Sequence, residues 1–66
     1  MNGVIRNLVL DRGFGFITGE DNKDYFFHHS ALQNGHYFRH LENGVRVTFE
    51  PTKGSKGLRA ENVEVV

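Results

Sequence analysis

Aromatic side chains gather in two short segments of the chain, and their spacing defines the chemistry that they can do. Phe14 and Phe16 lie two residues apart in one segment, and Phe26 and His28 lie two apart in the next. Residues two apart share one face of a β-strand. Planar rings that face solvent can stack on other flat groups, including unpaired bases, at about 1–3 kcal/mol per base.

The second segment carries rings on both of its faces, whereas a β-barrel has only one interior. Tyr25 and Phe27 share the face opposite to that of Phe26, so we expect them to pack into the core together with Ile17. The remaining rings would then form one solvent-facing platform, made of Phe14, Phe16, Phe26 and His28. Clustered exposed rings mark an interaction surface. The glycines beside them, Gly13 and Gly15, predict room for another backbone or a flat ligand to approach.

Five segments rich in β-branched and aromatic residues must hold these rings. We expect strands over residues 4–10, 14–18, 25–29, 44–50 and 58–66. Pro51 is expected to end the fourth strand because proline cannot donate to a strand ladder. After the third strand we expect one helical turn at 30–32, capped by Ser30, and a long connection over 33–43. This pattern predicts an all-β fold, a five-stranded antiparallel Greek-key barrel of the OB type.

Composition excludes several classes of protein. The chain has 66 residues, with 8 Lys+Arg against 8 Asp+Glu, so its formal net charge is zero. This length predicts a single domain over 1–66, and the zero charge excludes binding through a uniformly basic surface. The absence of Cys excludes a disulfide scaffold and a thiolate zinc site. With no signal peptide and no apolar run long enough for a membrane, we expect a soluble, cytoplasmic protein.

Two motifs in this framework resemble those of the bacterial cold-shock domain family. Residues 12–17 (RGFGFI) resemble the first ribonucleoprotein motif of that family, and residues 25–29 (YFFHH) resemble the second. Further matches continue the resemblance over essentially the whole chain, at residues 30–33, 41–44, 47–50 and 60–63. The resemblance implies a barrel that binds single-stranded RNA or DNA, needs no cofactor and has no enzymatic activity. It further implies an RNA chaperone that affects transcription or translation.

The resemblance also implies a set of binding residues. Stacking contacts would come from Phe14, Phe16, Phe26, His28 and Phe38, with His29 stacking less strongly. Phosphate contacts would come from Arg6, Arg12, Lys56 and Arg59, and a base edge could donate to Asp24. Three positions depart from the family pattern: Asn7 replaces a stacking Trp, and Leu8 and His29 each replace a Phe. Asn7 can hydrogen-bond a base but offers no comparable stacking area, which predicts weaker or differently tuned binding.

Other interpretations of the same residues stay open at this point. The exposed rings could bind a partner protein, and the salt dependence of binding would separate that function from phosphate recognition. The four His residues, 28, 29, 36 and 40, suggest a metal site. However, His28 and His29 are expected to face opposite ways on a strand, and no Cys or paired carboxylate completes a ligand set. A ribonuclease would need a second His paired with His28, and none is evident.

The sequence therefore predicts a nucleic-acid-binding module without a metal, a cofactor or a small-molecule substrate. We expect a monomer that makes no contact with a membrane. The long connection over 33–43 also leaves a domain-swapped dimer as an alternative.

Overall fold

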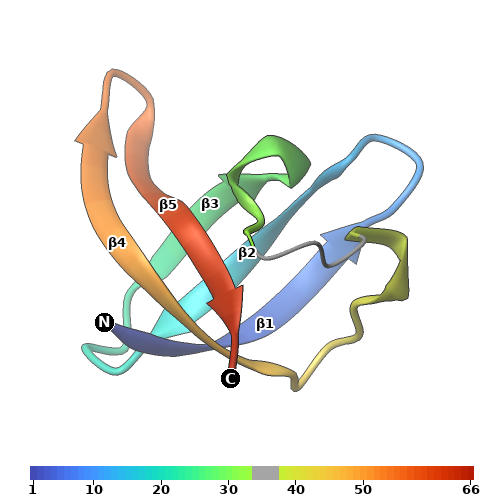
Figure 1. Ribbon diagram of the computed structural model, residues 1–66. Coiled ribbons are helices and arrows are strands. Elements are labelled where there is room, and N and C mark those ends of the chain that lie inside the picture. The colour runs from blue at the N-terminus through green and yellow to red at the C-terminus, as the bar shows by residue number, and fades with distance from the viewer. Residues whose placement is uncertain (34–37) are drawn as a thin grey trace.

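The computed structural model describes residues 1–33 and 38–66. Over these residues the strands are β1 (Asn2–Val9), β2 (Phe14–Gly19), β3 (Asp24–His28), β4 (Arg46–Gly54) and β5 (Gly57–Val65). Two short 3₁₀ helices, η1 (His29–Ala31) and η2 (Phe38–His40), lie between β3 and β4 (Figure 1). The all-β class is confirmed. No helix among the described residues has the length and apolar character needed to cross a membrane.

The strands close into a barrel in the order β1-β2-β3-β5-β4. Neighbouring strands run antiparallel except β3 and β5, which run parallel and meet where Phe26 lies opposite Arg59. Figure 1 shows β5 passing beside β3 at this point. The closed five-stranded barrel confirms the expected architecture. It also brings the turn between β4 and β5 close to the aromatic face of β2 and β3.

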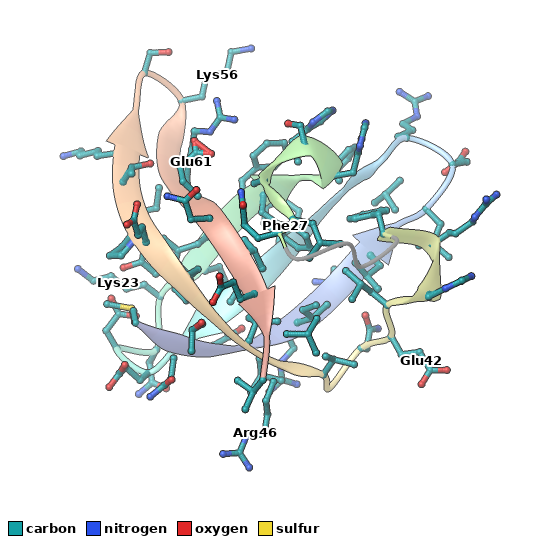
Figure 2. The ribbon with its side chains drawn as sticks, in the orientation of Figure 1. Lys23, Phe27, Glu42, Arg46, Lys56 and Glu61 are labelled. Carbon is teal, nitrogen blue, oxygen red and sulfur yellow. The ribbon has the colours of Figure 1, made fainter. Side chains whose placement is uncertain are left out.

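The barrel interior is filled by side chains from alternate positions of the strands. Ile17, Tyr25 and Phe27 are buried, as the alternation predicted. Phe27 is 0% exposed and lies in the middle of the molecule (Figure 2). Its buried neighbours come from all the other strands and include Ile5, Val47, Phe49, Ala60 and Val63. This core is formed without the rings on the opposite face of β2 and β3.

The expected end of the fourth strand at Pro51 is wrong. β4 continues to Gly54, and Pro51 lies opposite Ala60 of β5. β1 pairs with β4 only over residues 46–48, so one side of β4 is an edge at Pro51. A missing N–H breaks no ladder at an edge, which is why proline is tolerated there. The segment expected to connect the fourth and fifth strands is correspondingly shorter, because β4 ends at Gly54 and β5 already begins at Gly57.

The third strand ends at His28, one residue earlier than expected. Nδ1 of His28 accepts a hydrogen bond from the backbone N–H of Ser30 at 3.2 Å and lies 2.8 Å from the Ser30 hydroxyl oxygen. His28 therefore caps η1, and the expected cap by Ser30 is wrong. Because His29 belongs to η1 rather than to the strand, its ring turns back and lies 4.2 Å from the ring of His28. The expectation that the two rings face opposite ways is wrong as well.

The connection expected over 33–43 contains η2, which was not anticipated. Residues 34–37 lie outside the described residues, and so does His36, one of the four His residues considered as metal ligands. The described part of the connection is anchored at several points, two of which lie near its ends. The backbone N–H of Gln33 donates to the Val63 carbonyl at 2.8 Å, and Leu41 is buried in the core.

Candidate nucleic-acid interface

Three phenylalanine rings form a continuous surface on the outer side of β2 and β3. The ring centre of Phe26 lies 5.4 Å from that of Phe14 and 5.9 Å from that of Phe16, and the Phe14 and Phe16 centres are 6.3 Å apart. Phe16 lies opposite Phe26, and Phe14 lies opposite His28, so all four side chains share one face. We call Phe14, Phe16, Phe26 and His28 the aromatic patch. The structure places it on the outer face that the sequence predicted.

Each ring of the aromatic patch is half-buried. The rings bury part of their area against one another, in tilted and edge-on pairs of the kind that aromatic side chains prefer. Such contacts hold the rings in place and leave part of each available to a ligand. Rings fixed before binding lose little conformational freedom when a flat ligand stacks on them.

The rings of His29 and Phe38 extend the aromatic patch toward η2. The centre of the His29 ring lies 4.2 Å from that of His28 and 6.3 Å from that of Phe38. Phe38 is half-buried and also contacts the core ring of Phe27, at 5.7 Å between centres. Phe38 therefore contacts both a core ring, Phe27, and a surface ring, His29. Ring contacts now continue from His28 to η2 as well as among the three phenylalanines.

A groove opens beside the aromatic patch where β5 meets β3. Its volume is about 400 Å³, and it is lined by the rings of Phe16 and Phe26, by Leu58, and by the basic residues Lys56 and Arg59. The guanidinium carbon of Arg59 lies 5.5 Å from the centre of the Phe26 ring. This distance falls within the range of a cation–π contact. We call this the β3–β5 groove.

A second groove of about 400 Å³ lies at the other end of the ring series. The loop after β1 contributes Arg12, and the helical segments contribute His29, Phe38 and Arg39. Arg39 is absent from the binding residues that the sequence predicted. Its position next to Phe38 in the sequence was the signal that could have identified it.

Residues of β1 border the aromatic patch on its other side. Arg6 is exposed and lies opposite Phe16, so the two side chains leave the same face of the sheet. The pairing register then shifts between Arg6 and Val9, which marks a β-bulge. Asn7 lies in this bulge with a φ of 48°, in the left-handed region that asparagine tolerates better than most residues. Asn7 is exposed, as a base contact would require.

Of the two alternatives for the space beside the glycines of the first motif, a flat ligand is wrong, whereas the backbone of Leu8 does approach Gly15. A Cβ atom on Gly15 would lie 2.9 Å from Cδ2 of Leu8 and 3.1 Å from Cε1 of Phe27. A Cβ atom on Gly13 would lie 2.6 Å from Cδ2 of His29. Both glycines are therefore needed because the protein's own side chains occupy the adjacent space. Gly13 also has a φ of 73°, which favours glycine on conformational grounds.

Two aspartates near the start of β3 have different environments. Asp24 is exposed, two residues from Phe26 on the same face, and its Oδ1 accepts a hydrogen bond from the Thr18 hydroxyl at 2.8 Å. Asp21 accepts a 2.6 Å hydrogen bond from the Tyr25 hydroxyl. That bond lowers the pKa of Asp21 and raises the pKa of Tyr25. Asp21 therefore supports the fold, whereas Asp24 is available at the surface.

The zero net charge conceals an uneven distribution. Five of the eight Lys and Arg residues border the aromatic patch or line its grooves, namely Arg6, Arg12, Arg39, Lys56 and Arg59. On the β4–β5 ladder, Glu50 lies opposite Glu61, with Glu64 further along. In the part of the chain that the structure describes, no three His, Cys, Asp or Glu side chains come together as a metal-binding set.

Comparison with known proteins identifies the family. A model described as the 'Cold-shock' DNA-binding domain matches residues 1–66. The chain belongs to the cold-shock domain family. It is 44% identical over 63 residues to cold shock protein 2 of Lactiplantibacillus plantarum, covering 96% of this chain and 94% of the relative. It is 50% identical over 65 residues to the cold shock-like protein CspA of Stigmatella aurantiaca, covering 97% and 94%.

A solved structure supports the same fold. The barrel superimposes on a structure of drosophila Unr with a TM-score of 0.77 and 24% sequence identity, over 98% of this chain and 26% of that one. Cold-shock proteins bind nucleic acids and are not enzymes, so membership of the family confirms the expectation of a non-enzymatic protein. The cold-shock domain family binds single strands in particular.

Proposed function

We propose that this protein binds single-stranded RNA or DNA by stacking unpaired bases on its aromatic patch. One observation carries the proposal. Three phenylalanine rings lie 5.4–6.3 Å apart on the outside of a barrel whose core is filled without them. Every base presents a flat face, so such a surface binds single strands with little dependence on sequence. Further stacking comes from His28, His29 and Phe38, which continue the ring series toward η2.

Basic side chains beside the rings contact the phosphates of the bound strand. Arg6 flanks the aromatic patch at β1, while Lys56 and Arg59 line the β3–β5 groove. Arg12 lines the groove at the opposite end. These positions supply charge along the rings although the protein as a whole is neutral. Asn7 and Asp24 add hydrogen-bonding groups that can contact base edges.

The protein acts as an RNA chaperone that affects transcription or translation. A protein that binds only the open strand shifts a weak hairpin toward its unpaired form by mass action, so no ATP is needed. Duplex bases are already stacked on one another and cannot reach the rings. The 1–66 chain works in the cytoplasm as a single-domain monomer, where transcripts are its ligands.

Titration with short oligonucleotides at two salt concentrations tests this function. Four phosphate contacts predict that log K falls with log[salt] with a slope of about 3, at about 0.7 per contact. Lys56→Gln should reduce that slope by about 0.7. Arg46→Gln is the matched control and should leave the slope unchanged, since Arg46 lies at the opposite end of the molecule from Lys56 (Figure 2).

Two results of this titration would contradict the proposal. One is equal affinity for single-stranded and double-stranded oligonucleotides of the same sequence. The other is the absence of any oligonucleotide binding by the folded protein, which would favour the alternative that the rings bind a partner protein.

A further inference from the structure

We propose that the β3–β5 groove selects a guanine base, which stacks on Phe26 while Arg59 reads its edge. The inference rests on the proposed function and adds a base preference to it at one position, where Arg59 pairs with a guanine edge in place of a phosphate. It arises from Arg59, whose guanidinium N–H groups have no hydrogen-bond partner among the described residues.

The guanidinium group of Arg59 is available for a ligand. In the part of the chain that the structure describes, it has no hydrogen-bond or ion-pair partner, and it lies over the Phe26 ring. The hydrogen bond recorded for Arg59 involves only its backbone carbonyl, which accepts from the Thr52 hydroxyl. Five N–H donors in a planar fork are therefore free at the rim of an apolar groove.

The guanidinium of Arg59 covers one face of the Phe26 ring, and the proposed guanine stacks on that face. The guanidinium carbon lies 5.5 Å from the ring centre. A base inserted between the two groups would need two successive contacts of about 3.5–4.0 Å each, so it does not fit. An entering base must displace the guanidinium from above the ring to the side. Displacing the guanidinium from the ring costs free energy for every base. A base that then forms hydrogen bonds with the N–H donors of Arg59 offsets this cost.

Guanine is the base that pairs best with a displaced arginine fork. Its O6 and N7 are two adjacent acceptors, which match two N–H donors of a guanidinium. Adenine offers the N7 acceptor but places an amino donor beside it, and thymine offers O4 beside a methyl group. Adenine stacks on Phe26 as a purine of similar area. Arg59 therefore distinguishes guanine from adenine by its edge and not by its size.

Asp24 adds an acceptor near the same ring. It lies two residues before Phe26 on the same face of β3, whereas Arg59 lies opposite Phe26 on β5. The Thr18 hydroxyl donates to Oδ1 of Asp24, and Oδ2 has no partner among the described residues. A carboxylate oxygen accepts from N–H groups, and guanine carries an amino donor away from its O6 and N7 edge. A base on Phe26 thus has the N–H donors of Arg59 beside it on β5 and a carboxylate acceptor two residues away along β3.

The test measures the affinity of the full chain for a set of fluorescein-labelled hexathymidylates. In each, one thymine, at every position in turn, is replaced by guanine, adenine, 7-deazaguanine or hypoxanthine. In the best position guanine should tighten binding roughly 10-fold over thymine and over adenine. 7-Deazaguanine lacks N7 and should lose most of this gain, while hypoxanthine lacks the amino group and should lose part of it.

Variants at position 59 separate edge reading from charge. Arg59→Lys keeps the charge but lacks the fork, so it should abolish the guanine preference. Arg59→Gln should do the same and should also tighten binding of hexathymidylate at high salt, because Phe26 is then uncovered. Lys56→Gln is the control and should weaken all of the oligonucleotides by the same factor, as expected for a phosphate contact.

The outcomes distinguish this inference from the proposed function. Equal affinity for the guanine, adenine and 7-deazaguanine oligonucleotides would overturn the guanine site and leave single-strand binding intact. A guanine preference that survives in Arg59→Lys would also overturn it. Failure of the wild-type protein to bind any of the oligonucleotides would overturn both. The modified bases test the wild-type protein directly, so the inference stays falsifiable even where a variant does not fold.

Discussion

Replacement of Phe16 by Ala should separate the binding surface from the core. Phe16 is half-buried, whereas Phe27 on the neighbouring strand is fully buried. Stacking on an aromatic ring contributes about 1–3 kcal/mol per base, so Phe16→Ala should raise the Kd of a short single strand by about 5- to 150-fold.

The expected loss of stability follows from the partial burial of Phe16. Fully burying a Phe contributes about 1.5–3 kcal/mol, so half of the ring contributes about 1 kcal/mol. Each edge-on contact of Phe16, with Phe14 and with Phe26, adds about 0.5 kcal/mol, the lower end of the range for aromatic pairs, because the rings stay partly exposed. We expect Phe16→Ala to lower the free energy of unfolding by about 2 kcal/mol. A fully buried Phe would lose about 3–5 kcal/mol.

Phe27→Leu is the matched control for this experiment. It removes part of a buried ring beneath the same sheet, which leaves a small cavity and should cost less than the roughly 3–5 kcal/mol expected for replacing a buried Phe by Ala. Affinity should be measured by fluorescence anisotropy with labelled hexathymidylate, and stability by urea unfolding followed by circular dichroism. If Phe16→Ala unfolds the protein, or if Phe27→Leu weakens binding as much as Phe16→Ala does, the assignment of Phe16 to the binding surface is wrong.

Three further perturbations have defined outcomes. Asn7→Trp should tighten pyrimidine binding by at most about 1–3 kcal/mol through the added ring, as measured by anisotropy. It should also lower the free energy of unfolding in urea by about 1–2 kcal/mol, because position 7 has a φ of 48°, and unchanged stability would argue against this left-handed conformation. Gly15→Ala should lower the free energy of unfolding by about 1–3 kcal/mol, since its Cβ would lie 2.9 Å from Leu8, and an increase in stability would contradict this packing. Tyr25→Phe should lower the free energy of unfolding at pH 7, and its difference from the wild-type protein should shrink as acid protonates Asp21, whose pKa the Tyr25 hydroxyl lowers. Urea unfolding at a series of pH values measures this difference, and a constant difference would mean that the hydrogen bond is absent.

The sign of the pH effect follows from the direction of the shift. Since the folded-state pKa of Asp21 lies below its ordinary value, this carboxylate stabilises the fold above the ordinary pKa and stops doing so as the pH falls through the folded value. The raised pKa of Tyr25 adds a second limit, because its contribution is lost as the pH rises through the folded value. The hydrogen bond between the two groups stabilises the protein only between these limits.

Local alternation was enough to predict which rings face outward. Phe26 and Phe27 are adjacent in a strand, so one of them must leave the core, and the inward position of Ile17 on the paired strand decides which. This reasoning needs only the two-residue period of a strand. It placed the aromatic patch without any knowledge of the strand order.

Features that depend on strand ends and on neighbouring chain segments could not be predicted in this way. The position of Pro51 within β4 depends on where β1 stops pairing, which is a property of the closed barrel. The ring contact between His28 and His29 depends on β3 ending one residue earlier than its composition suggested. The position of Arg59 over Phe26 depends on the parallel pairing of β3 with β5, which are far apart in the sequence.

The central claim is that unpaired bases stack on the rings of Phe14, Phe16 and Phe26. It is tested most directly by NMR, through intermolecular nuclear Overhauser effects between these ring protons and the base protons of bound hexathymidylate. We expect effects from all three rings, together with upfield shifts of the thymine methyl signals. Effects confined to the acidic β4–β5 ladder around Glu50 and Glu61, with the three rings unperturbed, would contradict the proposed binding surface.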